Sequence, residues 1–360
     1  MDPLTQKYTI NGKQFDNNGA MGLCCEKSLN GQPWEVELYR FIQFWLSGAS
    51  AIPMYSSGST GSPKEMDFPR EAVIASARAT IEFFELNPGD KILLCLPIRY
   101  VAARLMVVRA LEGNLDLQIT APSGNPLVDL RESISFAAMV PLQVIDALDQ
   151  CPQQFGLIKK LIVGGSAIAP QLKDKLQQIP TQVWETYGMT ETLTHVAVRQ
   201  VNGHSPSNYF EALPGVGFSV DENECLVIDI PRVSPKPLLT RDVVQLIDPV
   251  RFILLGRLDN VINSGGIKLQ PESIEARLRP YVGLPFVIVG LPDVRLGQKV
   301  VLVVEGHRRS LDQILGINIS DIGKYEKPKE IIFVDKIPVG ENGKVLRKQL
   351  MDFLLNNSNL

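Results

Sequence analysis

The residue types best suited to binding an anion lie in residues 55–64 (YSSGSTGSPK). Two glycines allow the backbone to approach an anion closely, five Ser and Thr hydroxyls can donate hydrogen bonds, and a lysine adds a positive charge. Pro63 stands where a Walker phosphate loop has the glycine before its lysine, so the segment is not a Walker loop. Taken alone, it is equally compatible with a phosphate-binding loop and with a surface turn rich in Ser and Gly.

Five more segments follow that could act together with such a loop. They contain carboxylates, cationic side chains and glycine-rich turns. These segments are residues 187–191 (YGMTE), 240–242 (TRD), 256–266 (GRLDNVINSGG), 292–298 (PDVRLGQ) and 338–347 (PVGENGKVLR).

In this order, the six segments resemble the motifs of the adenylate-forming superfamily, which comprises acyl-CoA synthetases, peptide-synthetase adenylation domains and luciferases. The resemblance extends from residue 55 to residue 347. It implies a reaction in which a carboxylate attacks the α-phosphate of ATP, pyrophosphate leaves, and a thiol then displaces AMP. The implied cofactors are ATP, Mg²⁺ and coenzyme A, and the implied substrate is a small carboxylic acid.

The resemblance also implies which residues act in the first half-reaction. Thr190 would bond the α-phosphate, Glu191 would be the metal ligand for Mg²⁺, and Lys344 would bridge the attacking carboxylate and the α-phosphate. Preorganised donors and cations of this kind stabilise the dense negative charge of the reacting phosphate. The residues implied to hold the β- and γ-phosphates are Ser57, Gly58, Ser59, Thr60, Gly61 and Lys64.

Other residues would bind the nucleoside. By resemblance, Tyr187 would stack on adenine next to Gly188, and the turn at Gly164 and Gly165 would form the floor between adenine and the acyl pocket. Asp242 would accept hydrogen bonds from both ribose hydroxyls, a role that suits a carboxylate.

Residues around the hinge complete the implied set. Arg257 would assist at the ribose, and Asp259 would be the hinge on which a small domain turns between half-reactions. Gly265 and Gly266 would line the pantetheine tunnel in the second orientation. Arg241 replaces the middle glycine of the family pattern, which changes the local backbone requirement.

The elements that must position these motifs alternate between strand and helix patterns. Helical spacing covers residues 70–85 and 101–112, and the short apolar runs typical of buried strands are residues 91–96, 157–163, 225–230 and 251–255. Beyond residue 256 the pattern predicts helices over residues 271–278 and 344–355 and strands over residues 285–290, 299–305 and 330–334. We therefore predict an α/β protein. A large N-terminal α/β domain, residues 1–258, is a shortened version of the adenylate-forming fold, and a small mobile C-terminal α+β domain covers residues 259–360.

Composition excludes several other classes. With 36 Lys and Arg residues against 39 Asp and Glu residues and no basic cluster, a nucleic-acid partner is not expected. No apolar run is long enough for membrane insertion. The five scattered cysteines form no CxxC pair, which favours a reducing, cytoplasmic location over a disulfide framework or a zinc site. The sequence leaves the oligomeric state open, with a homodimer as one alternative.

Within the superfamily, the chain most resembles the o-succinylbenzoate–CoA ligases of menaquinone biosynthesis. The resemblance rests on residues 187–199 (YGMTETLTHVAVR), on residues 265–272 (GGIKLQPE), and on the compact spacing between motifs. Only about fifty residues precede the phosphate loop, fewer than is usual in the family, and Tyr100 stands at the family's gate position. Such a substrate has an aryl ring and a second carboxylate, so a cationic or hydroxyl-rich wall is expected in its pocket. The candidates for this wall are Arg99, Arg104, Thr194, His195 and Arg199.

Three alternatives stay open at this point. The chain could be another aryl or short-acyl CoA ligase, an adenylation enzyme that loads a carrier protein, or a non-catalytic nucleotide-binding relative. The presence of both Glu191 and Lys344 argues against the last, because binding alone would require neither.

Overall fold

The computed structural model describes residues 7–55, 65–203, 205–306, 322–340 and 345–356. Its contacts divide the chain into two units. The first comprises Met1–Phe218, Ile228–Leu238 and Asp248–Arg251; the second comprises Ser219–Val227, Leu239–Ile247 and Phe252–Leu360. The sequence predicts a single boundary after residue 258, so the division differs in assigning three earlier segments to the second unit. Which part moves during a reaction stays a prediction.

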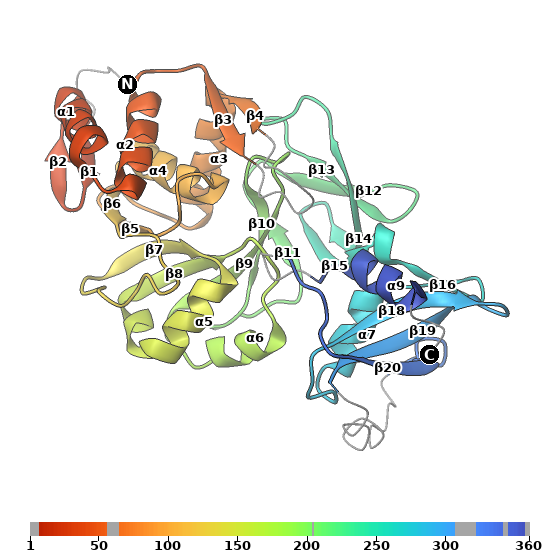
Figure 1. Ribbon diagram of the computed structural model, residues 1–360. Helices are drawn as coiled ribbons and strands as arrows, with labels where there is room; N and C mark the ends of the chain where they lie inside the picture. The colour runs from red at the N-terminus through yellow and green to blue at the C-terminus, as the bar shows by residue number, and fades with distance from the viewer. Residues whose placement is uncertain (1–6, 56–64, 204, 307–321, 341–344, 357–360) are drawn as a thin grey trace. The chain divides into compact units, whose positions relative to one another are not determined.

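The first unit is built on a mixed sheet whose strand order is β11-β10-β9-β8-β7-β5-β6-β1-β2 (Figure 1). Six strands from β9 to β1 run parallel, whereas β11, β10 and β2 are added antiparallel at the two ends. The strand bounds are β1 Tyr8–Ile10, β2 Lys13–Phe15, β5 Lys91–Leu94, β6 Asp116–Ile119, β7 Ile134–Met139, β8 Ile158–Val163, β9 Gln182–Gly188, β10 His195–Gln200 and β11 Phe210–Ala212. The runs predicted at residues 91–96 and 157–163 are confirmed as β5 and β8.

Six α-helices and a hairpin accompany this sheet. The helices are α1 Asn17–Asn30, α2 Pro33–Leu46, α3 Arg70–Phe83, α4 Val101–Gly113, α5 Pro141–Gln150 and α6 Pro170–Leu176, and a 3-10 helix, η1, covers Pro152–Leu157. The hairpin joins β3 (Ala51–Tyr55) to β4 (Glu65–Pro69). Helices α3 and α4 confirm the two predicted helical patterns. Helix α4 is buried over most of its circumference, as expected for a helix that is apolar on nearly all sides.

Four strands that belong in part to the second unit are neighbours in sequence order: β12 (Gly217–Val220), β13 (Cys225–Asp229), β14 (Leu238–Asp248) and β15 (Arg251–Arg257). A 3-10 helix, η2 (Leu258–Asn260), then leads into a five-stranded sheet of order β17-β16-β19-β18, in which β20 also pairs with β19. The bounds are β16 Ile262–Ser264, β17 Ile267–Leu269, β18 Phe286–Asp293, β19 Gly297–Glu305 and β20 Glu330–Val334, with helices α7 Pro271–Leu278 and α9 Arg347–Asn356.

This five-stranded sheet has an apolar core on each face. Successive residues of β19 alternate between the two cores, because successive side chains of a strand point to opposite faces. Val300, Leu302 and Val304 join the core that includes α7, whereas Val301 and Val303 join the core that includes α9. The predicted small α+β architecture is therefore confirmed. Among the described residues, no helix is both long and apolar enough to cross a bilayer.

Candidate active site

Two of the predicted adenine-binding segments leave the carboxyl ends of neighbouring parallel strands. Gly164 and Gly165 follow β8, and Tyr187 and Gly188 end β9. A Cβ atom on Gly164 would lie 2.3 Å from the Thr186 Oγ1, and Gly165 has φ of +87°, so both positions require glycine. Ligands of open α/β sheets bind at the carboxyl ends of the strands, and these two segments lie there.

The loop between β9 and β10 is internally braced. The Thr192 hydroxyl accepts a hydrogen bond from the Met189 N–H at 2.9 Å and donates to the Thr194 carbonyl at 2.7 Å. A Cβ atom on Gly188 would lie 2.4 Å from that same carbonyl oxygen, so the two ends of the loop approach each other closely. Leu193 is fully buried with φ of +68°, a conformation that costs about 1–3 kcal/mol and persists only where its surroundings enforce it.

This braced loop carries Thr190 and Glu191. The structure places them at adjacent positions, with Thr190 half-buried and Glu191 exposed. Mg²⁺ is usually held by one or two carboxylates together with substrate phosphates and water. An exposed carboxylate on a rigid loop at the nucleotide end of the sheet fits that pattern.

Tyr187 is held from one side by another aromatic ring. Only 9% of its surface is exposed, and its ring centroid lies 5.7 Å from that of Phe210. The guanidinium of Arg199 in turn lies 4.5 Å from the Phe210 ring centroid. The predicted stacking of Tyr187 on adenine stays a prediction.

Sequence reasoning missed Glu185, two residues before Tyr187. Its carboxylate is buried on β9, accepts a hydrogen bond from the Ile168 N–H at 3.0 Å, and pairs with Arg199 at 2.6 Å and Lys173 at 3.2 Å. Burial alone would raise the pKa of Glu185, but the charges of Arg199 and Lys173, together with hydrogen bonds from Arg199 and from the Ile168 N–H, outweigh burial and lower the pKa. A glutamate in a half-apolar strand was the only sequence signal, and it does not identify the partners.

The candidates for the acyl-pocket wall have different surroundings. Arg104 donates to the Ile98 carbonyl at 3.0 Å and lies over two aromatic rings, and Arg199 pairs with Glu185. Arg99 is exposed and donates to the Tyr100 hydroxyl at 3.1 Å. These three arginines therefore already have partners in the described part of the chain.

His195, the fourth candidate, is buried between two hydroxyls. Its Nε2 lies 3.5 Å from the Thr80 Oγ1, and its Nδ1 lies 3.4 Å from the Oγ1 of Thr194, the fifth candidate. Burial, and then the charges of Arg109 and Arg232, lower the pKa of His195 well below its usual range. The imidazole is therefore neutral at physiological pH.

Arg109, which sequence reasoning also missed, is the unusual cation of this region. It lies in α4 with only 1% of its surface exposed. Its Nη1 contacts the Met106 sulfur at 3.5 Å, and within the described ranges its Nε and Nη2 have no hydrogen-bond partner. Burial lowers its pKa to about 9. The sequence offers one sign of this residue, an arginine inside the apolar run of residues 101–113.

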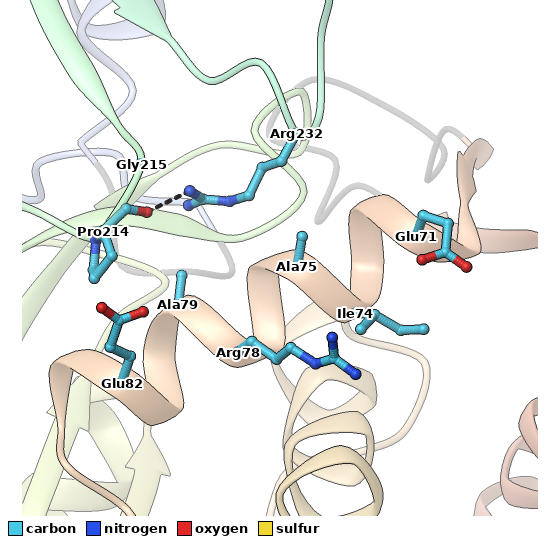
Figure 2. A pocket seen from close by; sticks show the side chains of 9 residues that line it. All are labelled: Glu71, Ile74, Ala75, Arg78, Ala79, Glu82, Pro214, Gly215 and Arg232. Atoms are coloured by element: carbon cyan, nitrogen blue, oxygen red, sulfur yellow. Dashed lines mark hydrogen bonds between the residues drawn. The ribbon is translucent and has the colours of Figure 1, made fainter. Parts of the chain in front are cut away.

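A separate cavity of about 400 Å³ lies along α3 (Figure 2). Arg232 lines it and donates a hydrogen bond to the Pro214 carbonyl at 2.5 Å. The remaining lining residues are Glu71, Ile74, Ala75, Arg78, Ala79, Glu82 and Gly215. None of the predicted site residues that the structure describes lines this cavity.

In the second unit, the predicted ribose and hinge residues form a chain of ion pairs. Arg257 pairs with Asp242 at 3.0 Å and with Asp259 at 3.5 Å, and Asp259 pairs with Arg241 at 2.6 Å. Hydrogen bonding from Arg241 is the largest cause of a lowered pKa at Asp259. Arg241, the departure from the family pattern, is therefore bound to the predicted hinge residue.

Gly265 and Gly266 form the two-residue connection of the β16–β17 hairpin. Their φ values are +62° and +83°, and Ser264 pairs with Ile267 on either side of them. Positive φ at both central residues is typical of a type I′ hairpin turn. This turn explains both glycines without a ligand, and their part in a pantetheine tunnel stays a prediction.

The remaining predicted site residues lie outside the described residues. They are Ser57, Gly58, Ser59, Thr60, Gly61, Lys64 and Lys344.

Comparison with known proteins shows the family. Residues 46–238 match the family model described as AMP-binding enzyme. The chain belongs to the AMP-binding enzyme family. The resemblance inferred from the six motifs is confirmed, and so, at the level of the family, is the prediction of an AMP-forming acyl-CoA ligase.

Individual relatives agree with this assignment. The chain is similar to the 2-succinylbenzoate–CoA ligase of Salmonella typhimurium, with 27% identity over 319 residues that cover 84% of this chain and 68% of that protein. It is also similar to the crystal structure of an acyl-CoA synthetase (AMP-forming)/AMP-acid ligase II-like protein from Dyadobacter fermentans, with 32% identity, a TM-score of 0.64, and coverage of 93% of this chain and 98% of that one. Escherichia coli MenE with a bound analogue of OSB-AMS shares the fold, with a TM-score of 0.67, 20% identity, and coverage of 85% of this chain and 69% of that one. The predicted adenylate-forming fold is confirmed.

Proposed function

We propose that the chain is an o-succinylbenzoate–CoA ligase that acts in menaquinone biosynthesis. In the first step, the acid's carboxylate attacks the α-phosphate of ATP, which forms the acyl-adenylate and releases pyrophosphate. In the second step, the thiol of coenzyme A attacks the acyl carbon, which forms the thioester and releases AMP. Family membership supports the reaction class, and the 2-succinylbenzoate–CoA ligases of Salmonella typhimurium and Lactococcus lactis are among the relatives.

The observation that carries the choice of acid is the buried guanidinium of Arg109. An unpaired buried charge costs several kcal/mol, so a protein rarely retains one without a use for it. o-Succinylbenzoate has a second carboxylate that does not react, and a planar guanidinium can bind such a group with two parallel hydrogen bonds. Nε and Nη2 are the two nitrogens of Arg109 without a partner in the described structure.

The surroundings of Arg109 suit that acid in two further ways. Burial is the largest cause of the lowered pKa of His195, and the charge of Arg109 contributes to it. His195 begins β10 directly after the loop that carries Thr190 and Glu191. A substrate bound between that loop and Arg109 would place one carboxylate at the nucleotide and the other at the buried cation.

The roles of the remaining residues complete the mechanism that we propose. Mg²⁺ at Glu191 would neutralise part of the charge on the ATP phosphates. Thr190 would donate to the α-phosphate, and Lys344 would bring a positive charge between the acid and that phosphate. Residues 259–360 would then turn about Asp259 and exchange Lys344 for the loop at residues 264–266.

The cellular setting follows from the substrates. ATP and coenzyme A are supplied in the cytoplasm, where cysteines stay reduced, and all five cysteines of this chain are free. We propose a cytoplasmic enzyme without a nucleic-acid partner. A homodimer remains an alternative to a monomer, and light scattering at micromolar concentration would distinguish them.

Pyrophosphate release with a panel of acids tests the proposal. We expect release with o-succinylbenzoate and thioester formation when free coenzyme A is added. Faster release with benzoate or with fatty acids would instead indicate another acyl-CoA ligase, and thioester formation only on a carrier protein would indicate a loading enzyme. No release with any acid, together with retained ATP binding, would indicate a non-catalytic relative.

A further inference from the structure

Three separate elements of the first unit meet at the carboxylate of Glu185. Only 5% of its side chain is exposed. One carboxylate oxygen accepts the backbone N–H of Ile168, and the other lies 2.6 Å from an Arg199 nitrogen and 3.2 Å from the Lys173 Nζ. Glu185 belongs to β9, Arg199 to β10 and Lys173 to α6, while Ile168 lies in the segment between β8 and α6.

The contact with Ile168 connects Glu185 to the segment that follows the turn at Gly164 and Gly165, the predicted floor of the adenine site. Ile168 follows Gly164 and Gly165 by a few residues, in a segment without regular secondary structure before α6. A buried backbone N–H must find a partner, and here the partner is a charged carboxylate. The Glu185 carboxylate therefore ties this segment to β9.

The second contact, with Arg199, connects Glu185 to the aromatic rings of Phe210 and Tyr187. Arg199 is directly opposite Glu185 in the β9–β10 register. Its guanidinium lies over the Phe210 ring at 4.5 Å, and the Phe210 ring packs against Tyr187 at 5.7 Å between centroids. The position of the Tyr187 ring thus depends on Phe210, whose position depends on the paired Arg199.

We propose that Glu185 is a positioning residue for the adenine base of ATP and AMP, because its carboxylate fixes both the turn at Gly164 and Gly165 and the support of Tyr187. This inference rests on the proposed function, which takes those two surfaces as the walls of the adenine site. Glu185 itself does not touch the nucleotide in this scheme. It acts through Ile168 on one side and through Arg199 on the other.

The substitution Glu185→Gln removes the negative charge of the side chain and keeps nearly the same shape. Glutamine keeps nearly the same volume and can still accept the Ile168 N–H, but it leaves Arg199 and Lys173 without their anion. Residues in one buried network are energetically coupled, so we expect the affinity for AMP to fall by about tenfold or more. Pyrophosphate, which has no base, should bind the variant as it binds the wild type.

Isothermal titration of AMP and, separately, of pyrophosphate with Mg²⁺ tests the inference. The matched control is Asp149→Asn, which removes the exposed Asp149–Lys175 ion pair of α5 and α6 and should change neither affinity. A selective loss of AMP affinity in Glu185→Gln supports the proposal. Equal losses for AMP and pyrophosphate, or an unchanged AMP affinity, overturn it.

A second variant keeps the test decisive if Glu185→Gln does not fold. Arg199→Lys retains the positive charge near the carboxylate but loses the planar guanidinium that covers Phe210. It should also lower AMP affinity without a change for pyrophosphate, and an unchanged AMP affinity would overturn the inference. Failure of the proposed function looks different, because the wild-type protein would then release no pyrophosphate with o-succinylbenzoate.

Discussion

Replacing Arg109 by methionine is expected to change stability and activity in opposite directions. Methionine fills a similar elongated volume in the apolar helix α4 and removes a buried charge that has no anionic partner in the described structure. Replacement of buried ions by well-packed apolar residues is often stabilising by about 1–4 kcal/mol. We therefore expect Arg109→Met to unfold at a higher denaturant concentration than the wild type.

Activity should fall for one class of acid only. If the guanidinium binds the second carboxylate of o-succinylbenzoate through two hydrogen bonds, each contributes about 1.5–3 kcal/mol because both groups are charged. Their loss corresponds to a decrease in kcat/KM of about 100-fold or more. Benzoate lacks the second carboxylate, so its kcat/KM should stay within about twofold. Pyrophosphate release with the two acids measures both values.

The pH dependence provides a further check on Arg109. Burial lowers the pKa of the folded guanidinium to about 9, while the unfolded chain keeps the ordinary, higher value. Above pH 9 the unfolded state therefore binds more protons than the folded state, and this residue makes wild-type stability rise with pH. Below pH 9 the guanidinium is charged in both states, so the full free-energy cost of burying its charge applies. The stability advantage of Arg109→Met should consequently be larger at pH 7.5 than at pH 10, as measured by denaturant titration.

The same substitution at Arg104 is the matched control. Arg104 also lies in α4, but it donates to the Ile98 carbonyl and lies over the rings of Phe41 and Tyr55. Arg104→Met should lower stability and leave the ratio of the two kcat/KM values unchanged. Equal losses for o-succinylbenzoate and benzoate in Arg109→Met, or a destabilised Arg109→Met, would refute the reasoning.

Three other predictions follow from the proposed reaction. Lys344→Ala should abolish adenylate formation and largely spare thioester formation from supplied acyl-adenylate, and equal loss of both steps would indicate a general defect instead. Thr192→Val removes the hydroxyl that braces the loop of Glu191, so the Mg²⁺ concentration for half-maximal adenylation should rise about threefold or more, with recovery in Thr192→Ser. Asp259→Pro should slow one half-reaction in single-turnover assays because proline restricts φ. Asp259→Asn, which loses the charge paired with Arg241 and Arg257 but leaves φ unrestricted, should slow neither step. Wild-type rates in Asp259→Pro would place the hinge elsewhere.

Periodicity predicted about half of the α-helices and about a third of the strands that the structure describes. The strands β5, β8, β18, β19 and β20 coincide with apolar runs. For β5, β18 and β19 the reason is that a strand largely buried on both faces is a nearly continuous apolar segment. The α+β character of the small sheet was likewise predictable, since Val300 to Val304 supply both of its cores. The division into two units depends on contacts between segments that are far apart in the chain, which no local sequence pattern specifies.

Charged residues were much harder to assign from the sequence. Arg104 and Arg199 were candidates for the wall of the acyl pocket, and the structure gives each of them a partner: the Ile98 carbonyl for Arg104 and the Glu185 carboxylate for Arg199. The carboxylate that pairs with Arg199 lies 14 residues away, across a strand pair whose register no local pattern specifies. A guanidinium is compatible with solvent, a ring, a carbonyl or a carboxylate, and only the fold decides among them.

Arg109 shows why the surroundings of a charged residue, which only the fold decides, matter for function. Local rules identify an arginine in an apolar helix as an inconsistency, and in most proteins such an arginine reaches solvent or a buried anion. Here Arg109 is buried in the fold. Its guanidinium contacts the Met106 sulfur, and its Nε and Nη2 have no hydrogen-bond partner among the described residues. Natural sequences break such rules chiefly where function compensates for the cost in stability. The proposed binding of a second carboxylate at Arg109 would supply such a compensation.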